Sequence, residues 1–232
     1  MTGLSPLIAS SAARITSLIR KPWGSRQRRR RVTTRNDALD QLRRVLSRPG
    51  GASSDFDLNP GYAPPKGRPL RPAAVLVAFQ EGASGLDLLL TKRSSRLKHH
   101  PGQIAFPGGK QDEVDSGPVD AALREASEEV GLPPASVEVL GQMQTHETVT
   151  GFLITPVIGF IRDAFEPIPE AGEVDEVFSV PLAHVTDPAR FSIEARIWRG
   201  QERQYYTVPY GPYYIWGATA RILRGLAEGM AA

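Results

Sequence analysis

The most restrictive feature of this sequence is the way short apolar runs that favour β-strands surround a single helical stretch in mid-chain. That stretch covers residues 119–130, and a second helical stretch covers residues 214–226. Strand runs on both sides of an inserted helix predict an α/β fold, in which helices pack on the faces of a mixed sheet. The runs expected to form strands are residues 73–79, 86–90, 137–144, 154–161, 193–199 and 204–209.

The composition is that of a globular protein rather than a disordered or membrane-spanning one. Hydrophobic residues make up 41% of the 232 residues and charged residues 23%. No uninterrupted apolar run approaches the roughly 20 residues that a transmembrane helix requires. The chain has no cysteine, which excludes disulfides, thiol nucleophiles and cysteine-ligated metal centres. This composition fits a reducing compartment, and we expect a cytoplasmic protein.

Charge divides the chain into two unlike parts. Residues 1–36 contain no acidic residue but nine of the 28 basic ones. From Asp37 onward the remaining 19 basic residues stand against 25 acidic ones, a net charge of −6. The overall charge of +3 is therefore the sum of a basic leader and an acidic body. By itself it does not indicate that the protein binds nucleic acid.

We expect residues 1–36 to form a flexible leader. Three functions suit its composition: a weak helix on an anionic membrane surface, a nucleic-acid-binding tail, or an organellar import signal if the source is eukaryotic. The alternative is an extension without a dedicated partner. Residues 37–71 then comprise a helix over 37–47, capped by Asn36, and a Pro- and Gly-rich linker or ordered wrap over the domain at 72–228.

The mid-chain helix carries three glutamates on one side. Glu125, Glu128 and Glu129 fall at i, i+3 and i+4, so their carboxylates project near one another. Like charges packed in this way destabilise a helix unless a cation lies among them. A hard cation such as Mg²⁺ or Mn²⁺ suits an all-oxygen cluster, although a solvated acidic face is the alternative for three glutamates alone. The opposite side, expected to bury against a sheet, is lined by Val119, Leu123, Ala126 and Val130.

Glycines flank this helix on both sides. Upstream, Gly108 and Gly109 follow Phe106-Pro107, and paired glycines let the backbone approach a ligand where a side chain would clash. Downstream, Gly131 supplies a helix stop. The sequence therefore predicts a unit made of a loop, a carboxylate-bearing helix and a second loop.

This unit resembles the Nudix box, the signature of hydrolases that act on diphosphates linked to another moiety. The family pattern is G-x5-E-x7-R-E-U-x-E-E-x-G-U, where U is a bulky aliphatic residue. Residues 124–132, REASEEVGL, match its second half, with Ala126 as a small version of U. In the first half one residue is inserted. Counting forward from Gly109 places the first acidic position at Asp115, whereas counting back from Arg124 places it at Ser116.

Two further stretches are similar to the coenzyme A pyrophosphatase branch of that family. They are residues 89–109 and 215–223, with Lys98 where the branch usually carries an arginine. The whole resemblance spans residues 71–226. It implies a Nudix-like α/β/α sandwich with a mixed sheet. It also implies metal-dependent hydrolysis of coenzyme A or its thioesters to 4′-phosphopantetheine and 3′,5′-ADP.

The resemblance implies roles for the residues of the box. Glu125 and Glu129 would hold Mg²⁺ or Mn²⁺, with the backbone carbonyl of Gly109 as a further ligand. Glu128 would add a ligand, contact a second metal or accept a proton. Bound cations would neutralise the diphosphate so that water can be positioned for attack. Arg124 would orient the glutamates by ion pairing rather than touch the substrate.

The general base has several candidates. Besides Glu128, Glu173 and Glu176 lie outside the box, where the family often carries its base. Surface charge on a loop is the alternative for Glu173 and Glu176. The sequence therefore leaves three residues for this role.

Substrate recognition would use cations just before the paired glycines. Arg93, Lys98, His99 and His100 could meet the 3′-phosphate or the diphosphate of coenzyme A. Each alone suits a solvated surface position, and it is their place beside the box that favours binding. The isolated His146 and His184 are expected to be structural.

Two other functions compete with coenzyme A hydrolysis. The first is Nudix hydrolysis of ADP-ribose or dinucleotide polyphosphates. The second is a non-catalytic ligand sensor whose basic tail binds nucleic acid or a membrane, against which the intact glutamates argue. A small-molecule diphosphate is the expected partner, and a homo-oligomer is compatible with the sequence.

Overall fold

The computed structural model describes residues 34–48, 50–62, 67–198 and 200–232. Residues 1–33, which make up most of the predicted leader, lie outside the described part of the chain, so the predictions for the leader stay predictions. In the described part, no helix has the length and apolar character needed to cross a membrane.

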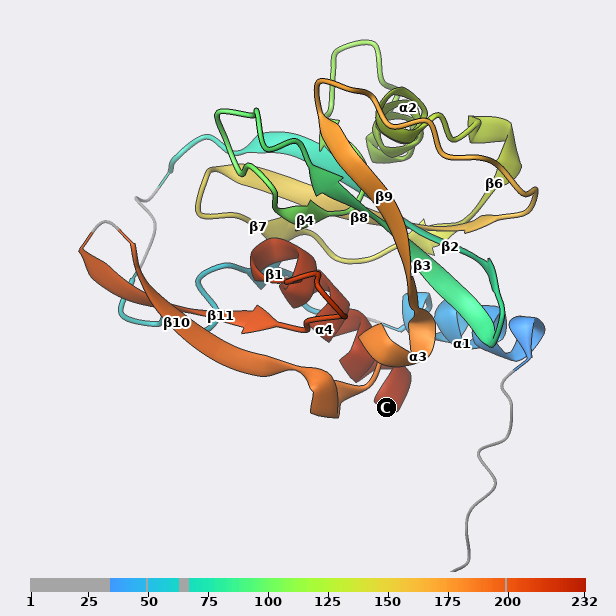
Figure 1. Ribbon diagram of the computed structural model, residues 1–232. Helices are drawn as coiled ribbons and strands as arrows, with labels where there is room; N and C mark the ends of the chain where they lie inside the picture. The colour runs from blue at the N-terminus through green and yellow to red at the C-terminus, as the bar shows by residue number, and fades with distance from the viewer. Residues whose placement is uncertain (1–33, 49, 63–66, 199) are drawn as a thin grey trace, which may run out of the picture. The chain divides into compact units, whose positions relative to one another are not determined.

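Helices at both ends of the described chain enclose a strand-rich middle (Figure 1). The helices are α1 (Arg35–Leu46), α2 (Pro118–Val130), α3 (Leu182–Val185) and α4 (Gly217–Ala231). The strands are β1 (Ser53–Ser54), β2 (Arg71–Gly82), β3 (Gly85–Arg93), β4 (Ile104–Ala105), β5 (Gly108–Lys110), β6 (Val137–Gln142), β7 (His146–Glu147), β8 (Phe152–Ile161), β9 (Val174–Pro181), β10 (Ser192–Trp198) and β11 (Gln201–Thr207). All six predicted strand runs and all three predicted helices are present, with shifted ends.

Strand β2 organises a mixed sheet of nine strands among the described residues. It pairs in parallel with β8, from Arg71 opposite Phe152 to Phe79 opposite Phe160. It pairs antiparallel with β3 and with β5, while β9 adds to the far side of β3. Strands β10 and β11 form a separate antiparallel hairpin. The predicted mixed sheet is confirmed.

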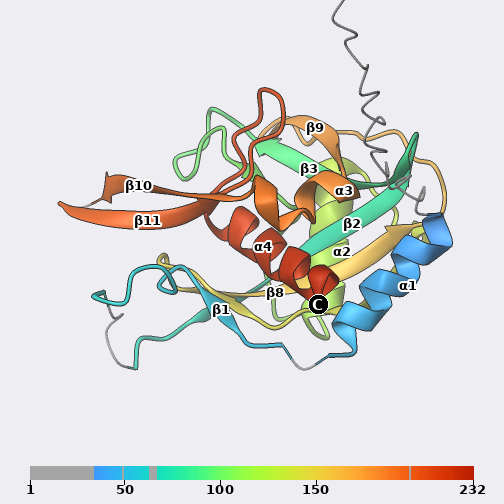
Figure 2. The ribbon, with the colours of Figure 1, turned by 90° about the horizontal axis from the view of Figure 1, so that it is seen from below.

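Side chains of β2 alternate between two hydrophobic cores because successive residues of a strand point to opposite faces. Val77 and Phe79 join one core with α1, α3 and α4, whereas Leu76 and Ala78 join the other with α2. Figures 1 and 2 show these helices on opposite faces of the sheet. The predicted α/β/α sandwich is therefore confirmed.

Helix α1 begins two residues before the predicted start at Asp37. Thr34 is its N-cap: its hydroxyl accepts from the backbone N–H of Asp37 at 3.2 Å, and the Asp37 carboxylate accepts from the Thr34 N–H at 3.2 Å. This reciprocal capping box satisfies two backbone donors, whereas a single Asn cap would satisfy one. Asn36 lies inside the helix, so the prediction that it caps the helix is wrong.

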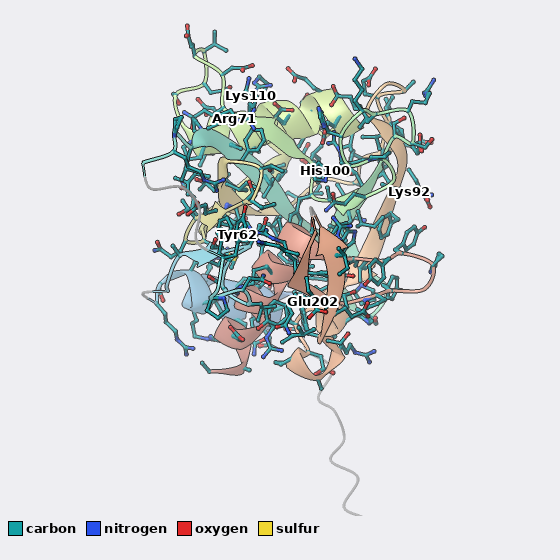
Figure 3. The ribbon with its side chains drawn as sticks, turned by 90° about the vertical axis from the view of Figure 1, so that its left-hand side faces the viewer. Tyr62, Arg71, Lys92, His100, Lys110 and Glu202 are labelled. Carbon is teal, nitrogen blue, oxygen red and sulfur yellow. The ribbon has the colours of Figure 1, made fainter. Side chains whose placement is uncertain are left out.

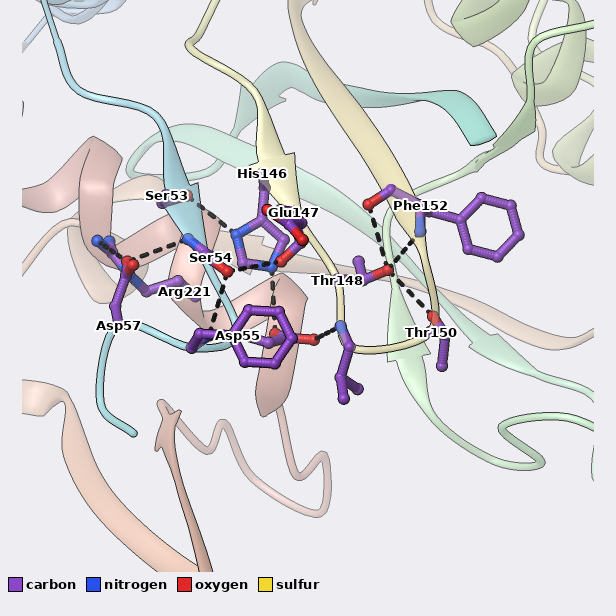
Figure 4. Close-up of polar contacts among 12 residues, drawn as sticks. Ser53, Ser54, Asp55, Asp57, His146, Glu147, Thr148, Thr150, Phe152 and Arg221 are labelled. Carbon is purple, nitrogen blue, oxygen red and sulfur yellow. Dashed lines mark hydrogen bonds and ion pairs between the residues drawn. The ribbon is translucent and has the colours of Figure 1, made fainter. Parts of the chain in front are cut away.

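Residues 50–62 are an ordered segment rather than a free linker. Strand β1 pairs in parallel with β7, and the side chain of His146 in β7 contacts residues in and after β1 (Figure 4). The fully buried His146 ring lies with Nδ1 2.9 Å from the Ser53 hydroxyl and Nε2 3.2 Å from Asp55 Oδ1. The other Asp55 oxygen accepts from the Val149 N–H at 2.8 Å. His146 is thus structural, as the sequence predicts.

Candidate active site

Helix α2 lies close to the sheet because its buried face is built from small residues. Ala121, Ala122 and Ala126 are fully buried against the core that includes β2. The helix starts with Pro118 in its first turn and ends at Gly131, whose φ of 71° is left-handed. Of the residues predicted to be buried, Ala126 and Val130 are buried, whereas Val119 and Leu123 are only partly buried. Glu129, which the sequence predicts on the opposite side, is buried as well.

Glu129 is the most enclosed carboxylate of the helix, with 4% exposure. Its Oε2 accepts from the backbone N–H of Gly108 at 3.0 Å, and its Oε1 lies 3.8 Å from the Arg93 guanidinium. Burial raises the pKa of Glu129 to about 7, although the Gly108 hydrogen bond and Arg93 both oppose the rise. The Gly108 N–H and Arg93 thus hold a carboxylate in a place where water does not stabilise its charge.

Glu125 lies against the next glycine of the turn. A Cβ atom on Gly109 would be 2.4 Å from Glu125 Oε1, so only glycine leaves room for this carboxylate. Partial burial raises the pKa of Glu125, while Arg124 opposes the shift. Gly108 and Gly109 therefore position two carboxylates one helical turn apart on the same helix face.

Arg124 gathers the acidic side chains around it. Its guanidinium makes a two-point ion pair with Asp115 and donates to Glu125 at 3.1 Å and Glu128 at 2.9 Å. Of the two candidates for the first acidic position, Asp115 is therefore the one that pairs with Arg124, whereas Ser116 hydrogen-bonds to Asp120.

The two base candidates outside the box lie in different places. The Glu170 N–H donates to the carbonyl of Glu129 at 2.9 Å, which draws this segment across the end of α2. Glu173 follows, and its charge contributes to the raised pKa values of Glu125 and Glu129. Glu176 lies inside β9, not on a loop, and accepts from the Tyr213 hydroxyl.

The donor atoms fit a hard divalent cation. Glu129 contacts Gly108 and Glu125 contacts Gly109, so the two carboxylates lie beside neighbouring residues of the turn. These potential ligands are oxygen atoms, which hard cations prefer to nitrogen or sulfur. Glu128 is exposed and held by Arg124. Among the described residues, no three acidic or histidine side chains already converge as a metal site. The site therefore fits Mg²⁺ or Mn²⁺ by donor chemistry, with two carboxylates in place.

A pocket of about 760 Å³ is lined by Lys92, the neighbour of Arg93 in β3, and by residues 100–104 of the loop after β3. Of the predicted substrate residues, His100 lines this pocket, and Figure 3 shows it near Lys92. Arg93 instead reaches Glu129, and the exposed Lys98 and His99 do not line the pocket. The predicted cluster of four therefore does not act as one unit.

His100 adopts an unusual backbone conformation for a non-glycine residue, with φ of 56°. Desolvation and the positive charges of Arg93 and Arg196 lower its pKa, although a hydrogen bond to Gln103 raises it. The pocket residues that sequence reasoning missed are Lys92, Gln103, Glu176's partner Tyr213, Tyr214, Arg196 and Trp216. Lys92, Gln103 and Trp216 lie in the stretches that resemble the coenzyme A branch, but no local motif marks Arg196, Tyr213 or Tyr214. The fold brings these residues together from β3, β10 and the approach to α4.

Comparison with known families and proteins agrees with this geometry. The NUDIX domain matches residues 69–199. A Citrobacter koseri protein called "Uncharacterized Nudix hydrolase NudL" is 43% identical over 157 residues, which cover 68% of this chain and 81% of that protein. Its Escherichia coli K12 namesake is 41% identical over the same shares.

Two solved structures have a limited likeness to the chain. An Ap4A hydrolase binary complex from C. elegans is 18% identical and covers 48% of this chain and 80% of its own, with a TM-score of 0.42. A MutT/nudix family protein from Enterococcus faecalis is 16% identical and covers 72% of this chain and 64% of its own, with a TM-score of 0.44.

Proposed function

We propose, on the premise that this chain belongs to the Nudix hydrolase family, that it cleaves the diphosphate bond of coenzyme A or of an acyl-coenzyme A. Family membership makes the chain a hydrolase of diphosphate substrates. The choice of coenzyme A goes further and is our proposal. Its products would be 4′-phosphopantetheine and 3′,5′-ADP.

One observation carries the proposal for coenzyme A. The stretch that resembles the coenzyme A branch, residues 89–109, forms one wall of the 760 Å³ pocket through Lys92 and residues 100–104. Arg93 connects this wall to α2, because it pairs with Glu129 through its side chain and with Gln103 through its backbone N–H. This arrangement supports the proposal, because part of the stretch that resembles the branch lines a pocket and Arg93 of the same stretch contacts Glu129.

The residues of the box would bind the metal and the diphosphate. Glu125 and Glu129 would hold Mg²⁺ or Mn²⁺, with the Gly109 carbonyl as a further donor. The bound cation would supply charge neutralisation at the phosphoryl oxygens. Arg124 would keep Glu125 and Glu128 in place by ion pairing.

Glu173 is the base that we favour. The charge of Glu173 contributes to the raised pKa values of both Glu125 and Glu129, which supports its position beside the box. Its own side chain is exposed, so it can receive a proton from the attacking water and release it to solvent. Glu176 is engaged by Tyr213 and faces the pocket, which suits substrate binding better.

A substrate panel tests the function. We expect the purified chain with Mg²⁺ or Mn²⁺ to hydrolyse coenzyme A and acyl-coenzyme A faster than ADP-ribose or diadenosine polyphosphates. Product analysis should show 3′,5′-ADP. Hydrolysis of ADP-ribose or of dinucleotides without hydrolysis of coenzyme A would replace the proposal with its alternative. No hydrolysis of any diphosphate would favour a ligand sensor.

A further inference from the structure

The pocket lined by Lys92 brings basic side chains of β3 and the loop after it together with one from a hairpin about 100 residues later. Lys92 comes from β3, His100 from the following loop and Arg196 from the β10–β11 hairpin. Figure 3 shows Lys92 and His100 above the hairpin, on which Glu202 is labelled. A smaller neighbouring pocket of about 160 Å³ is also lined by His100 and Arg196. Arg196 therefore lines both pockets.

Acidic partners do not neutralise these cations. Within the described part of the chain, neither Lys92 nor Arg196 forms an ion pair with a carboxylate. One carboxylate, Glu176, also lines the pocket; it stands opposite Lys92 in the pairing of β3 with β9 and accepts a hydrogen bond from Tyr213. Arg196 thus provides the positive charge of the pocket that no carboxylate faces across a strand pair.

The position of Arg196 on the hairpin adds to this conclusion. Its cross-strand partner is Arg203, and like charges placed directly opposite each other destabilise a sheet. Aromatic rings hold both side chains: the guanidinium carbon of Arg196 lies 4.3 Å from the Trp216 ring centre, and that of Arg203 lies 3.8 Å from the Tyr62 ring centre. An anion beside Arg196 would reduce the repulsion between the two guanidinium groups.

The pocket adjoins the site of the chemistry without sharing its carboxylates. The Gly102 N–H donates to the Arg93 carbonyl at 3.0 Å, and the Arg93 N–H donates to the Gln103 carbonyl at 2.9 Å. The loop with His100 is thus fixed to the residue whose side chain reaches Glu129. A substrate whose diphosphate is bound at the box could therefore place a further group of its nucleoside part among these basic side chains.

We propose that Arg196 binds a second phosphate group on the ribose of the substrate, with help from Lys92 and His100. This inference rests on the proposed function, because coenzyme A carries such a group as its 3′-phosphate. Arg196 would then be a specificity-determining residue, supplied by a hairpin that lies outside the Nudix box. A phosphate dianion suits it, since a guanidinium donates to two phosphate oxygens at once.

Comparing coenzyme A with dephospho-coenzyme A, which lacks the 3′-phosphate, tests this proposal. We expect the wild-type protein to prefer coenzyme A in kcat/KM. Arg196→Ala should lower kcat/KM for coenzyme A roughly 10- to 100-fold, the size of one or two lost charged hydrogen bonds, and leave dephospho-coenzyme A nearly unchanged. Arg196→Lys should retain part of the preference. Arg190→Ala, which removes an exposed cation paired with Asp187, is the matched control and should alter neither substrate.

Two outcomes would overturn the proposal while leaving the function intact. One is equal kcat/KM of the wild-type protein for coenzyme A and dephospho-coenzyme A. The other is a loss of equal size on both substrates in Arg196→Ala, which would indicate a general role in binding or folding.

Calorimetry separates the proposal from the proposed function. We expect 3′,5′-ADP to bind the wild-type protein at least tenfold more tightly than 5′-AMP, and Arg196→Ala to abolish the difference. That result would support the phosphate site even if coenzyme A were not hydrolysed, a failure that would overturn only the proposed function. Equal affinity for the two nucleotides would overturn the phosphate site.

Discussion

Asp115 and Arg124 meet in a two-point ion pair, with Nε 2.9 Å from Oδ1 and NH2 3.0 Å from Oδ2. The Asp115 side chain is only 4% exposed, and the hydrogen bonds from Arg124 hold its pKa below the ordinary value. The same guanidinium donates to Glu125. Asp115 is therefore a positioning residue, which acts on the box through Arg124.

We expect Asp115→Asn to weaken the use of metal more than the fold. An amide cannot pair with both guanidinium nitrogens as acceptors, so Arg124 is free to turn away from Glu125. Such indirect partners typically change metal affinity by about 10–100-fold. The Mg²⁺ concentration at half-maximal activity measures the effect. Asp112→Asn is the control, because Asp112 is exposed and 3.7 Å from Arg124. An unchanged Mg²⁺ dependence in Asp115→Asn would refute the role.

The two adjacent glycines should respond differently to alanine. In Gly108→Ala the new Cβ would lie 2.4 Å from the carbonyl oxygen of Ala74, which is backbone and cannot give way. We expect a loss of about 1–3 kcal/mol in the free energy of unfolding. In Gly109→Ala the Cβ would meet the end of the Glu125 side chain, which can move. That variant should keep most of its stability and lose most of its activity.

Thermal unfolding and steady-state assays of both variants check this contrast. Equal losses of stability in the two variants would contradict it. So would full activity in Gly109→Ala, since it would show that the contact with Glu125 has no role.

Glu129→Gln should inactivate the protein without weakening its metal-free fold. Burial raises the pKa of Glu129 to about 7, whereas the pKa of a glutamate in the unfolded chain is near 4.3. At any pH above about 4.3, ionisation of this carboxylate therefore favours the unfolded chain over the folded protein. Replacing it with a neutral amide should raise the free energy of unfolding at pH 8 by about 1–3 kcal/mol.

Mg²⁺ should reverse the order of stability of the wild-type protein and Glu129→Gln. The wild-type protein should gain thermal stability from the cation, whereas Glu129→Gln should not. Glu81→Gln, at an exposed residue paired with Arg35, is the control and should follow the wild type. Stabilisation of Glu129→Gln by Mg²⁺ to the wild-type extent would contradict the assignment of Glu129 as a ligand.

His184 should make stability depend on pH between about 5 and 7. Its Nε2 donates to the Pro209 carbonyl at 2.9 Å, but desolvation dominates and lowers the pKa of the ring. The unfolded chain then binds a proton more readily than the folded protein, so stability falls as pH drops through about 6.5. His184→Gln should reduce the difference in unfolding temperature between pH 7.5 and pH 5.5. An identical difference in the two proteins would disprove the linkage.

The contact between Ser53 and His146 should contribute to stability but not to catalysis. Ser53→Ala leaves Nδ1 of a fully buried ring without its partner, which typically costs about 1–3 kcal/mol. We expect a lower unfolding temperature, with kcat retained at 20 °C. Ser47→Ala is the control, because the Ser47 hydroxyl bonds only to the exposed end of α1. A matching effect in both variants would show that the buried contact is unimportant.

Local patterns predict the elements well where hydrophobic periodicity and glycine signals coincide. The helix of the box ends at Gly131 as its sequence indicates. Strand β9 was missed although Val174, Val177 and Val180 favour a strand, because the acidic residues between them suit a loop equally well. Its pairing with β3 supplies the burial that decides between the two.

The site is less predictable because contacts between distant segments determine it. Spacing places Glu125 and Glu129 on one face of a helix, but it cannot show that Glu129 is buried against Gly108. Proximity in sequence suggested that Lys98 and His99 act with His100, yet Arg196, almost 100 residues later, lines the same pocket. Only the topology reveals that neighbour.

The segment shared with the family and the segment that folds have different borders. The match ends at residue 199 and starts at residue 69, yet Leu42 of α1 and Leu223 of α4 are completely buried in the same core as Phe79. A fragment cut to the shared borders would expose that core face of the sheet to water and should aggregate. The family match thus covers less of the chain than the core requires, because α1 and α4 lie outside residues 69–199 and still keep water from one face of the sheet.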